Sequence, residues 1–200
     1  DGMDTAYKVV LSSCKGFGVL ANIQDIDIYG IRHISAKDIA YACKHGYVCK
    51  LIGSGVKSDS GVSGTVIPTF IPKQNIFATI PANFNAIESD SKTLGKMTYV
   101  GQGAGSYPTA HAVVQDLIDL VLHQDTEVSS GVGVHVDNKN RVSSFYVRSV
   151  NLNRIEDVIE ERIDEDTCIT KKISFVELAS VIKVLEDDAV FVAEVMHDCK

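Results

Sequence analysis

The feature that most constrains the fold is a long strand-like stretch, residues 48–100, that lies between two helical patterns. Ser35 and Asp38 form a capping-box signature that begins the first of these helices. Residues 109–123 carry apolar side chains at helical spacing, which predicts the second helix. Helices combined with several strands in this way predict an α+β fold, in which helices pack on a mixed β-sheet.

The strand-like stretch contains four runs with the composition and alternation of strands. We expect these strands at residues 48–53, 62–71, 83–87 and 96–100. Pro68 lies inside the second run and Pro72 directly after it. Because proline has no N–H to donate to a sheet, the two prolines predict an edge position for this strand, or its end.

The C-terminal residues 143–200 show the order strand, helix, strand, helix, strand, which is typical of a small ferredoxin-like α+β module. The expected strands are residues 144–148, 167–173 and 189–195, and the expected helices are residues 154–162 and 175–185. Residues 125–142 are polar and rich in turn formers, so we interpret them as a linker. The predicted organisation is therefore a first region at 1–124, a linker at 125–142 and a second region at 143–200.

Composition and charge exclude several classes of function. The chain has 19 Lys and Arg against 26 Asp and Glu, a net charge of -7, and no basic stripe that would favour nucleic acid. No apolar run approaches the roughly 20 residues of a membrane span. The five cysteines have no framework spacing, which is typical of reduced thiols in a cytoplasmic protein. The six histidines show no chelating spacing, so we expect no metal site.

Two groups of residues could carry chemistry. Asp4 and Lys8 are four residues apart in a helical pattern, so both side chains project from one helix face. They could form a solvated ion pair, or they could hold a lysine that exchanges a proton with a substrate oxygen. Spacing alone does not choose between these two interpretations.

The second group is the glycine cluster at residues 101–105, which follows a predicted strand and precedes a helix. The Rossmann fingerprint GxGxxG would need glycine at position 106, where Ser106 stands. The cluster is therefore either a tight strand-to-helix turn or a loop that lets a ligand approach the backbone closely.

Several blocks of the sequence resemble homoserine dehydrogenases. The first eight residues, DGMDTAYK, resemble the family's D-G-x-D-x-x-x-K block. The most specific resemblance is carried by residues 99–110, YVGQGAGSYPTA. Further blocks lie at residues 30–39, 46–52, 66–72 and 85–87 with Asp90. The blocks follow one another in the family's order over residues 1 to about 120.

The resemblance implies an oxidoreductase that interconverts L-homoserine and L-aspartate 4-semialdehyde with NAD(P), on the route to threonine and methionine. It implies that Lys8 transfers the proton at the substrate hydroxyl, and that Asp4 binds the substrate and orients Lys8. It also implies that Gly103, Ala104 and Gly105 lie against the nicotinamide end of the cofactor. A homodimer is expected for the same reason, and residues 143–200 resemble an ACT regulatory domain in the order of their elements.

In that family a nucleotide-binding domain precedes the segment, whereas this sequence begins at Asp1 without an initiator methionine. We therefore expect a catalytic fragment whose main NAD(P) site lies on a missing N-terminal domain, and which is inactive alone. The alternative is a non-catalytic oligomerisation or amino-acid-sensing module derived from the same family.

Overall fold

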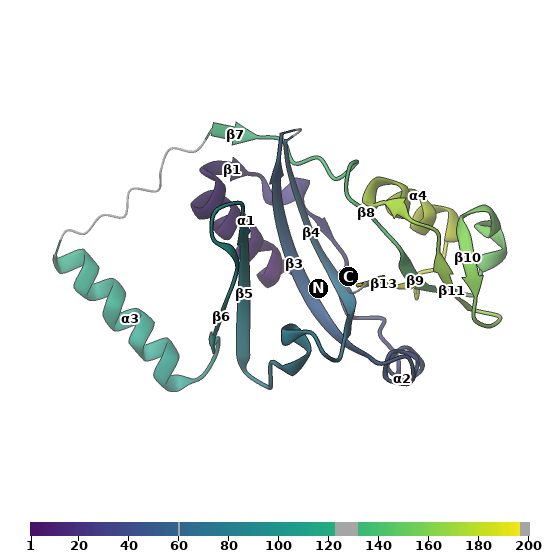
Figure 1. Ribbon diagram of the computed structural model, residues 1–200, viewed down its shortest axis with the longest axis horizontal. Coiled ribbons are helices and arrows are strands. Elements are labelled where there is room, and N and C mark those ends of the chain that lie inside the picture. The colour runs from purple at the N-terminus through teal and green to yellow at the C-terminus, as the bar shows by residue number, and fades with distance from the viewer. Residues whose placement is uncertain (60, 123–131, 197–200) are drawn as a thin grey trace. The chain divides into compact units, whose positions relative to one another are not determined.

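The computed structural model describes residues 1–59, 61–122 and 132–196 (Figure 1). The chain forms two compact units, one of residues 1–73 with 128–200 and one of residues 74–127. The predicted division at 125–142 stays a prediction, and residues 125–131 of that linker lie outside the described residues.

Among the described residues, the first unit contains three α-helices and a seven-stranded sheet. The helices are α1 (Met3–Phe17), α2 (Ala36–Lys44) and α4 (Phe175–Leu185). The strands of the large sheet are β2 (Asp27–Ile28), β3 (Tyr47–Ser58), β4 (Gly61–Pro72), β9 (Phe145–Arg148), β10 (Ile159–Arg162), β11 (Thr167–Thr170) and β13 (Phe191–Val195). Two small sheets join β1 (Val19–Ala21) to β7 (Val132–Val134) and β8 (Val142–Ser143) to β12 (Ile173–Ser174).

The large sheet has the strand order β10-β11-β9-β13-β4-β2, and β3 pairs with β4 along the long hairpin visible in Figure 1. Strands β2 and β13 run parallel to β4, and the other neighbours are antiparallel. The sheet is therefore mixed and carries helices, as the sequence predicted.

Strand β4 is central, so the predicted edge position of this strand is wrong. One side of β4 pairs with β3, while β2 and β13 share the other side. Pro68 is tolerated because the register of β2 ends at Val66 and that of β13 begins at Thr69, which leaves the proline between the two partners. Pro72 ends the strand, as expected.

Successive residues of β4 point to opposite faces of the sheet and so anchor different helices. Val66 packs in the core cluster of α1, and Phe70 packs in the cluster that includes Ala42 of α2. Ile67 packs in the cluster of α4. Helices α1 and α2 therefore cover one face and α4 covers the other, and all three are fixed to one strand.

The C-terminal part differs from the expected module at its first helix. In place of the helix expected at residues 154–162, 3-10 turns form at Leu152–Arg154 and Glu156–Val158, and strand β10 follows. β-branched Ile159 favours an extended backbone where the strand begins, and β10 pairs with β11, with a register shift between Ile159 and Glu161. Because β13 pairs with β4, the segment shares a sheet with the N-terminal part, and a separate ACT-like domain is not confirmed.

The described part of the second unit, residues 74–122, contains a hairpin and an α-helix. Strands β5 (Phe84–Ser91) and β6 (Gly95–Gln102) pair over their full length, and α3 (Ser106–Val121) follows directly. A 3-10 turn at Ile76–Thr79 precedes the hairpin. The glycine cluster thus ends β6 and, through residues 103–105, connects it to α3, as the sequence predicted.

Candidate functional site

Asp4 and Lys8 lie on the solvent-facing side of α1. Ala6 and Val9 of the same helix are buried against the sheet. The helix therefore has a core face with Ala6 and Val9 and a solvent-exposed face with Asp4 and Lys8. The Lys8 Nζ lies 3.0 Å from Asp4 Oδ2, and the two side chains are 56% and 86% exposed. Such an exposed pair adds at most a few tenths of a kcal/mol to stability, so the pair has little structural purpose.

Glycines on β3 set the position of α1. A Cβ on Gly53 would lie 2.6 Å from Val9 Cγ2 and 2.7 Å from Thr5 Cγ2, and a Cβ on Gly55 would lie 2.6 Å from Ser13 Oγ. The helix therefore approaches the strand more closely than any larger residue would allow. Thr5, Val9 and Ser13 therefore face the sheet. Asp4 and Lys8 lie on the side of the helix that faces away from it.

Replacing Gly53 by alanine is expected to lower the free energy of unfolding by about 1–3 kcal/mol, because the added methyl group overpacks the contact with α1. The matched control is Gly16→Ala, at a helical position where a Cβ meets nothing within 4 Å. This control should raise stability by about 0.5–1 kcal/mol. Urea unfolding of both variants measures the effect, and equal stabilities would contradict the close contact.

The start of α1 is held from a neighbouring loop. Gly2, the N-cap residue, has φ 91°, and Asp1 before it forms an ion pair with Arg32. Asp1, Gly30, Arg32 and His33 line a small cavity of about 250 Å³ at this end of the helix. The sequence does not indicate the pairing of Asp1 with Arg32, since no local spacing pattern relates two residues that are 31 positions apart.

A buried polar network fixes the loop that carries Arg32. The Asp38 carboxylate is fully buried and accepts hydrogen bonds from Tyr146 Oη and Arg148 Nε, both at 2.8 Å. Arg148 also donates to the His33 carbonyl oxygen at 2.6 Å. Asp38 in addition completes the capping box with Ser35, which confirms the helix start read from the sequence. Strand β9 therefore anchors both α2 and the loop before it.

The ionisation of this network follows from its contacts. Burial raises the pKa of Asp38, but the hydrogen bonds from Arg148, Ser35 and Tyr146 outweigh it and hold that pKa below its ordinary value. Burial and the same carboxylate raise the pKa of Tyr146 far above its usual range. Asp38 is therefore a carboxylate and Tyr146 a neutral donor at neutral pH.

The glycine loop of the second unit is tied to the start of the hairpin. Gly103 N donates to the Asn83 carbonyl oxygen, and Asn83 Nδ2 donates to the Ala104 carbonyl oxygen, both at 2.9 Å. Gly105 has φ 129°, a conformation that favours glycine, and α3 begins after it without a side-chain cap. Gly103, Ala104 and Gly105 thus form an ordered turn between β6 and α3.

The predicted site residues therefore fall into both units. Asp4 and Lys8 are in direct contact in the first unit, and residues 103–105 form a single turn in the second. Within the described ranges, 1–59, 61–122 and 132–196, no cluster of His, Cys, Asp or Glu could hold a metal ion. In the same residues, no helix is long and apolar enough to cross a membrane.

Comparison with known proteins shows the family of the chain. The family model for homoserine dehydrogenase matches residues 1–118, so the chain belongs to the homoserine dehydrogenase family. Homoserine dehydrogenase from Neisseria gonorrhoeae is 36% identical over 120 residues, which are 60% of this chain and 28% of the relative. The Synechocystis enzyme is 37% identical over 125 residues, 60% of this chain and 29% of the relative.

Two solved structures share the fold beyond the matched region. A homoserine dehydrogenase from Thiobacillus denitrificans covers 98% of this chain with a TM-score of 0.75 at 22% identity. The S. aureus homoserine dehydrogenase at pH 8.5 covers 99% with a TM-score of 0.68 at 26% identity. The chain spans about half of each solved chain and less than a third of the curated relatives.

Proposed function

We propose that this chain is the catalytic region of an enzyme that interconverts L-homoserine and L-aspartate 4-semialdehyde with NAD(P), for threonine and methionine synthesis in the cytoplasm. The single observation that supports this most is the contact of Lys8 with Asp4 at 3.0 Å on the free face of α1. The pair stands in the sequence block that resembles the family's site. Its exposure leaves it available to a substrate instead of committing it to the core.

The chemistry assigns a separate role to each member of the pair. In the direction of homoserine oxidation, the uncharged amine of Lys8 takes the proton from the substrate hydroxyl as the hydrogen on the same carbon leaves as hydride. In the reverse direction, the Lys8 ammonium returns the proton to the aldehyde oxygen. Asp4 binds the substrate and, by its contact with Nζ, orients Lys8 toward the hydroxyl.

Residues 103–105 fit a bound nicotinamide dinucleotide, which would supply the hydride acceptor. The turn is ordered by its hydrogen bonds to Asn83, and the start of α3 carries no capping side chain that would block it. A Cβ on Gly101, at the end of β6, would meet nothing within 4 Å, whereas one on Gly103 would meet Asn85 Nδ2 at 2.0 Å, so the open space lies beside Gly101. The main NAD(P) site is proposed to lie on a preceding domain, since residues 101–106 do not satisfy the Rossmann fingerprint.

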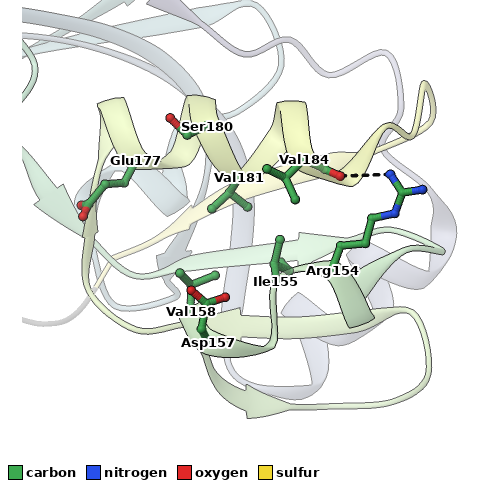
Figure 2. A pocket seen from close by; sticks show the side chains of 8 residues that line it. All are labelled: Arg154, Ile155, Asp157, Val158, Glu177, Ser180, Val181 and Val184. Atoms are coloured by element: carbon green, nitrogen blue, oxygen red, sulfur yellow. Dashed lines mark hydrogen bonds between the residues drawn. The ribbon is translucent and has the colours of Figure 1, made fainter.

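A second candidate function is a non-catalytic module for oligomerisation or amino-acid sensing, and a groove in the C-terminal part favours it. Figure 2 shows Val181 and Val184 of α4 facing Ile155 and Val158 across this groove, with the Arg154 guanidinium at one end. Its volume is about 280 Å³. An ACT-like effector site at residues 143–200 and a homodimer remain proposals within either function.

Assays of homoserine-dependent reduction of NAD⁺ and NADP⁺ test the proposal. The protein encoded by the complete reading frame is expected to turn over homoserine, whereas the 200 residues alone are expected to show none. The reason is that hydride transfer needs a bound dinucleotide, and its main site is proposed to lie outside these residues. Turnover by the 200 residues alone would overturn the fragment proposal, and no turnover by the complete protein would favour the non-catalytic module.

A further inference from the structure

The side chain of Asn85 lies in the space that a side chain at position 103 would need. A Cβ on Gly103 would be 2.0 Å from Asn85 Nδ2, 2.5 Å from Cγ and 3.0 Å from Oδ1. The absence of a side chain at Gly103 therefore makes a seat for the Asn85 carboxamide. The glycine in the middle of the loop is explained by this contact before any ligand is considered.

The contact between Asn85 and Gly103 lies where the turn before β5 meets the glycine loop. Asn85 is paired with Gly101 in the register of β5 and β6. Asn83, two residues earlier, donates a hydrogen bond from Nδ2 to the Ala104 carbonyl oxygen of the loop. The turn before β5 is closed by a bond of 3.0 Å from Phe84 N to the Pro81 carbonyl oxygen. Ala82 in this turn has φ 41°, a left-handed conformation that L-residues rarely adopt. The strand start and the loop are thus hydrogen-bonded to each other beside the carboxamide.

The hydrogen-bonding groups of the Asn85 carboxamide are available to a ligand. Asn85 is exposed, and among the residues that the structure describes its side-chain amide forms no hydrogen bond. An asparagine amide offers one acceptor oxygen and two N–H donors. The carboxamide of nicotinamide offers the same set, so two such groups can pair through reciprocal N–H···O bonds.

We propose that the Asn85 carboxamide, seated on Gly103, binds the carboxamide of the nicotinamide ring and so sets the orientation of the ring at residues 103–105. This inference rests on the proposed function, because it takes the cofactor contact at that loop as given. The inference adds Asn85, which is not part of the glycine loop, to the cofactor site. It assigns to Gly103 the role of leaving space for the Asn85 side chain.

The test compares two cofactors in the same protein, so that general effects on stability cancel. Dissociation constants of NAD(P)⁺ and of its 3-acetylpyridine analogue are measured by calorimetry on the complete protein. The analogue keeps the carbonyl oxygen but has a methyl group in place of the amide nitrogen. The wild type is expected to bind the natural cofactor about fivefold to tenfold more tightly, the range expected for one hydrogen bond.

Two variants of Asn85 should have different effects on this ratio. Asn85→Ala should reduce it to within about twofold, because neither cofactor then finds an amide partner. Asn85→Asp should keep or widen it, because a carboxylate accepts from the amide N–H but repels the oxygen of the ketone. Ser89→Ala, on the same strand and face, is the control and should leave the ratio unchanged.

The outcomes separate this inference from the function on which it rests. A ratio that is the same in the wild type, Asn85→Ala and Asn85→Asp would overturn the role of Asn85 and leave the proposed function standing. Failure of the wild-type complete protein to bind either dinucleotide would overturn both.

Discussion

Lys8→Ala in the complete protein is expected to lower kcat for homoserine oxidation by about 10²–10⁴-fold, the usual contribution of a positioned proton-transfer group. KM for homoserine should change by only a few fold, because the role proposed for the lysine is to take the hydroxyl proton as it departs. Stability should be nearly unchanged, since the side chain is more than half exposed and its ion pair contributes little. Steady-state kinetics together with thermal unfolding measure both effects.

Lys15→Ala is the matched control for this experiment. Lys15 is an exposed lysine in the last turn of the same helix, so its removal changes net charge and helix composition in the same way. It should retain wild-type kcat. If Lys8→Ala also retained wild-type kcat, the pair with Asp4 would be an ordinary surface ion pair.

Asp38→Asn is expected to produce the largest loss of stability, about 3–5 kcal/mol in the free energy of unfolding. The substitution leaves the Arg148 guanidinium, only 17% exposed, without its charged partner and weakens the capping box of α2. Chemical unfolding at pH 7 measures the loss. Glu186→Gln removes a carboxylate from an exposed pair with Arg154 and should cost no more than about 0.5 kcal/mol.

The effect of Asp38→Asn should depend on pH in a defined direction. The pKa of Asp38 is lower in the folded chain than its ordinary value of 3.8, so the folded state binds the proton less well than the unfolded state. The stabilisation by the carboxylate is complete above the ordinary value and is lost as pH falls through the lower folded pKa. The difference between the wild type and Asp38→Asn should therefore shrink below about pH 4. A difference that stayed constant down to pH 2 would contradict the role of the charged form.

Local signals in the sequence were sufficient where the determining contacts are local. The box of Ser35 and Asp38 is confirmed, and so is the placement of Asp4 and Lys8 on one helix face, because both depend on residues three or four positions apart. The glycine loop was also located correctly between a strand and a helix.

Two of the differences from the sequence predictions involve partners that are distant in the chain. Asp38 was interpreted as a cap alone, because Arg148, its main partner, lies 110 residues away. The central position of β4 depends on where β2 and β13 end and begin, which no local pattern around Pro68 records. The helix expected at residues 154–162 gave way to β10 because pairing with β11 outweighs the weak helical spacing of that segment.

Strands β2 and β13 share one side of β4, and this arrangement has a consequence for folding during synthesis. Strand β2 is synthesised before β4, but β13 leaves the ribosome more than a hundred residues after it. Until then the backbone of β4 at Thr69 and Phe70 has no neighbour on that side, and Phe70 lacks the side chains of Phe191 and Ala193 that share its cluster. The first unit thus completes its core only after β13 has been synthesised, and until then its nascent form carries an open sheet edge that must be kept from other chains.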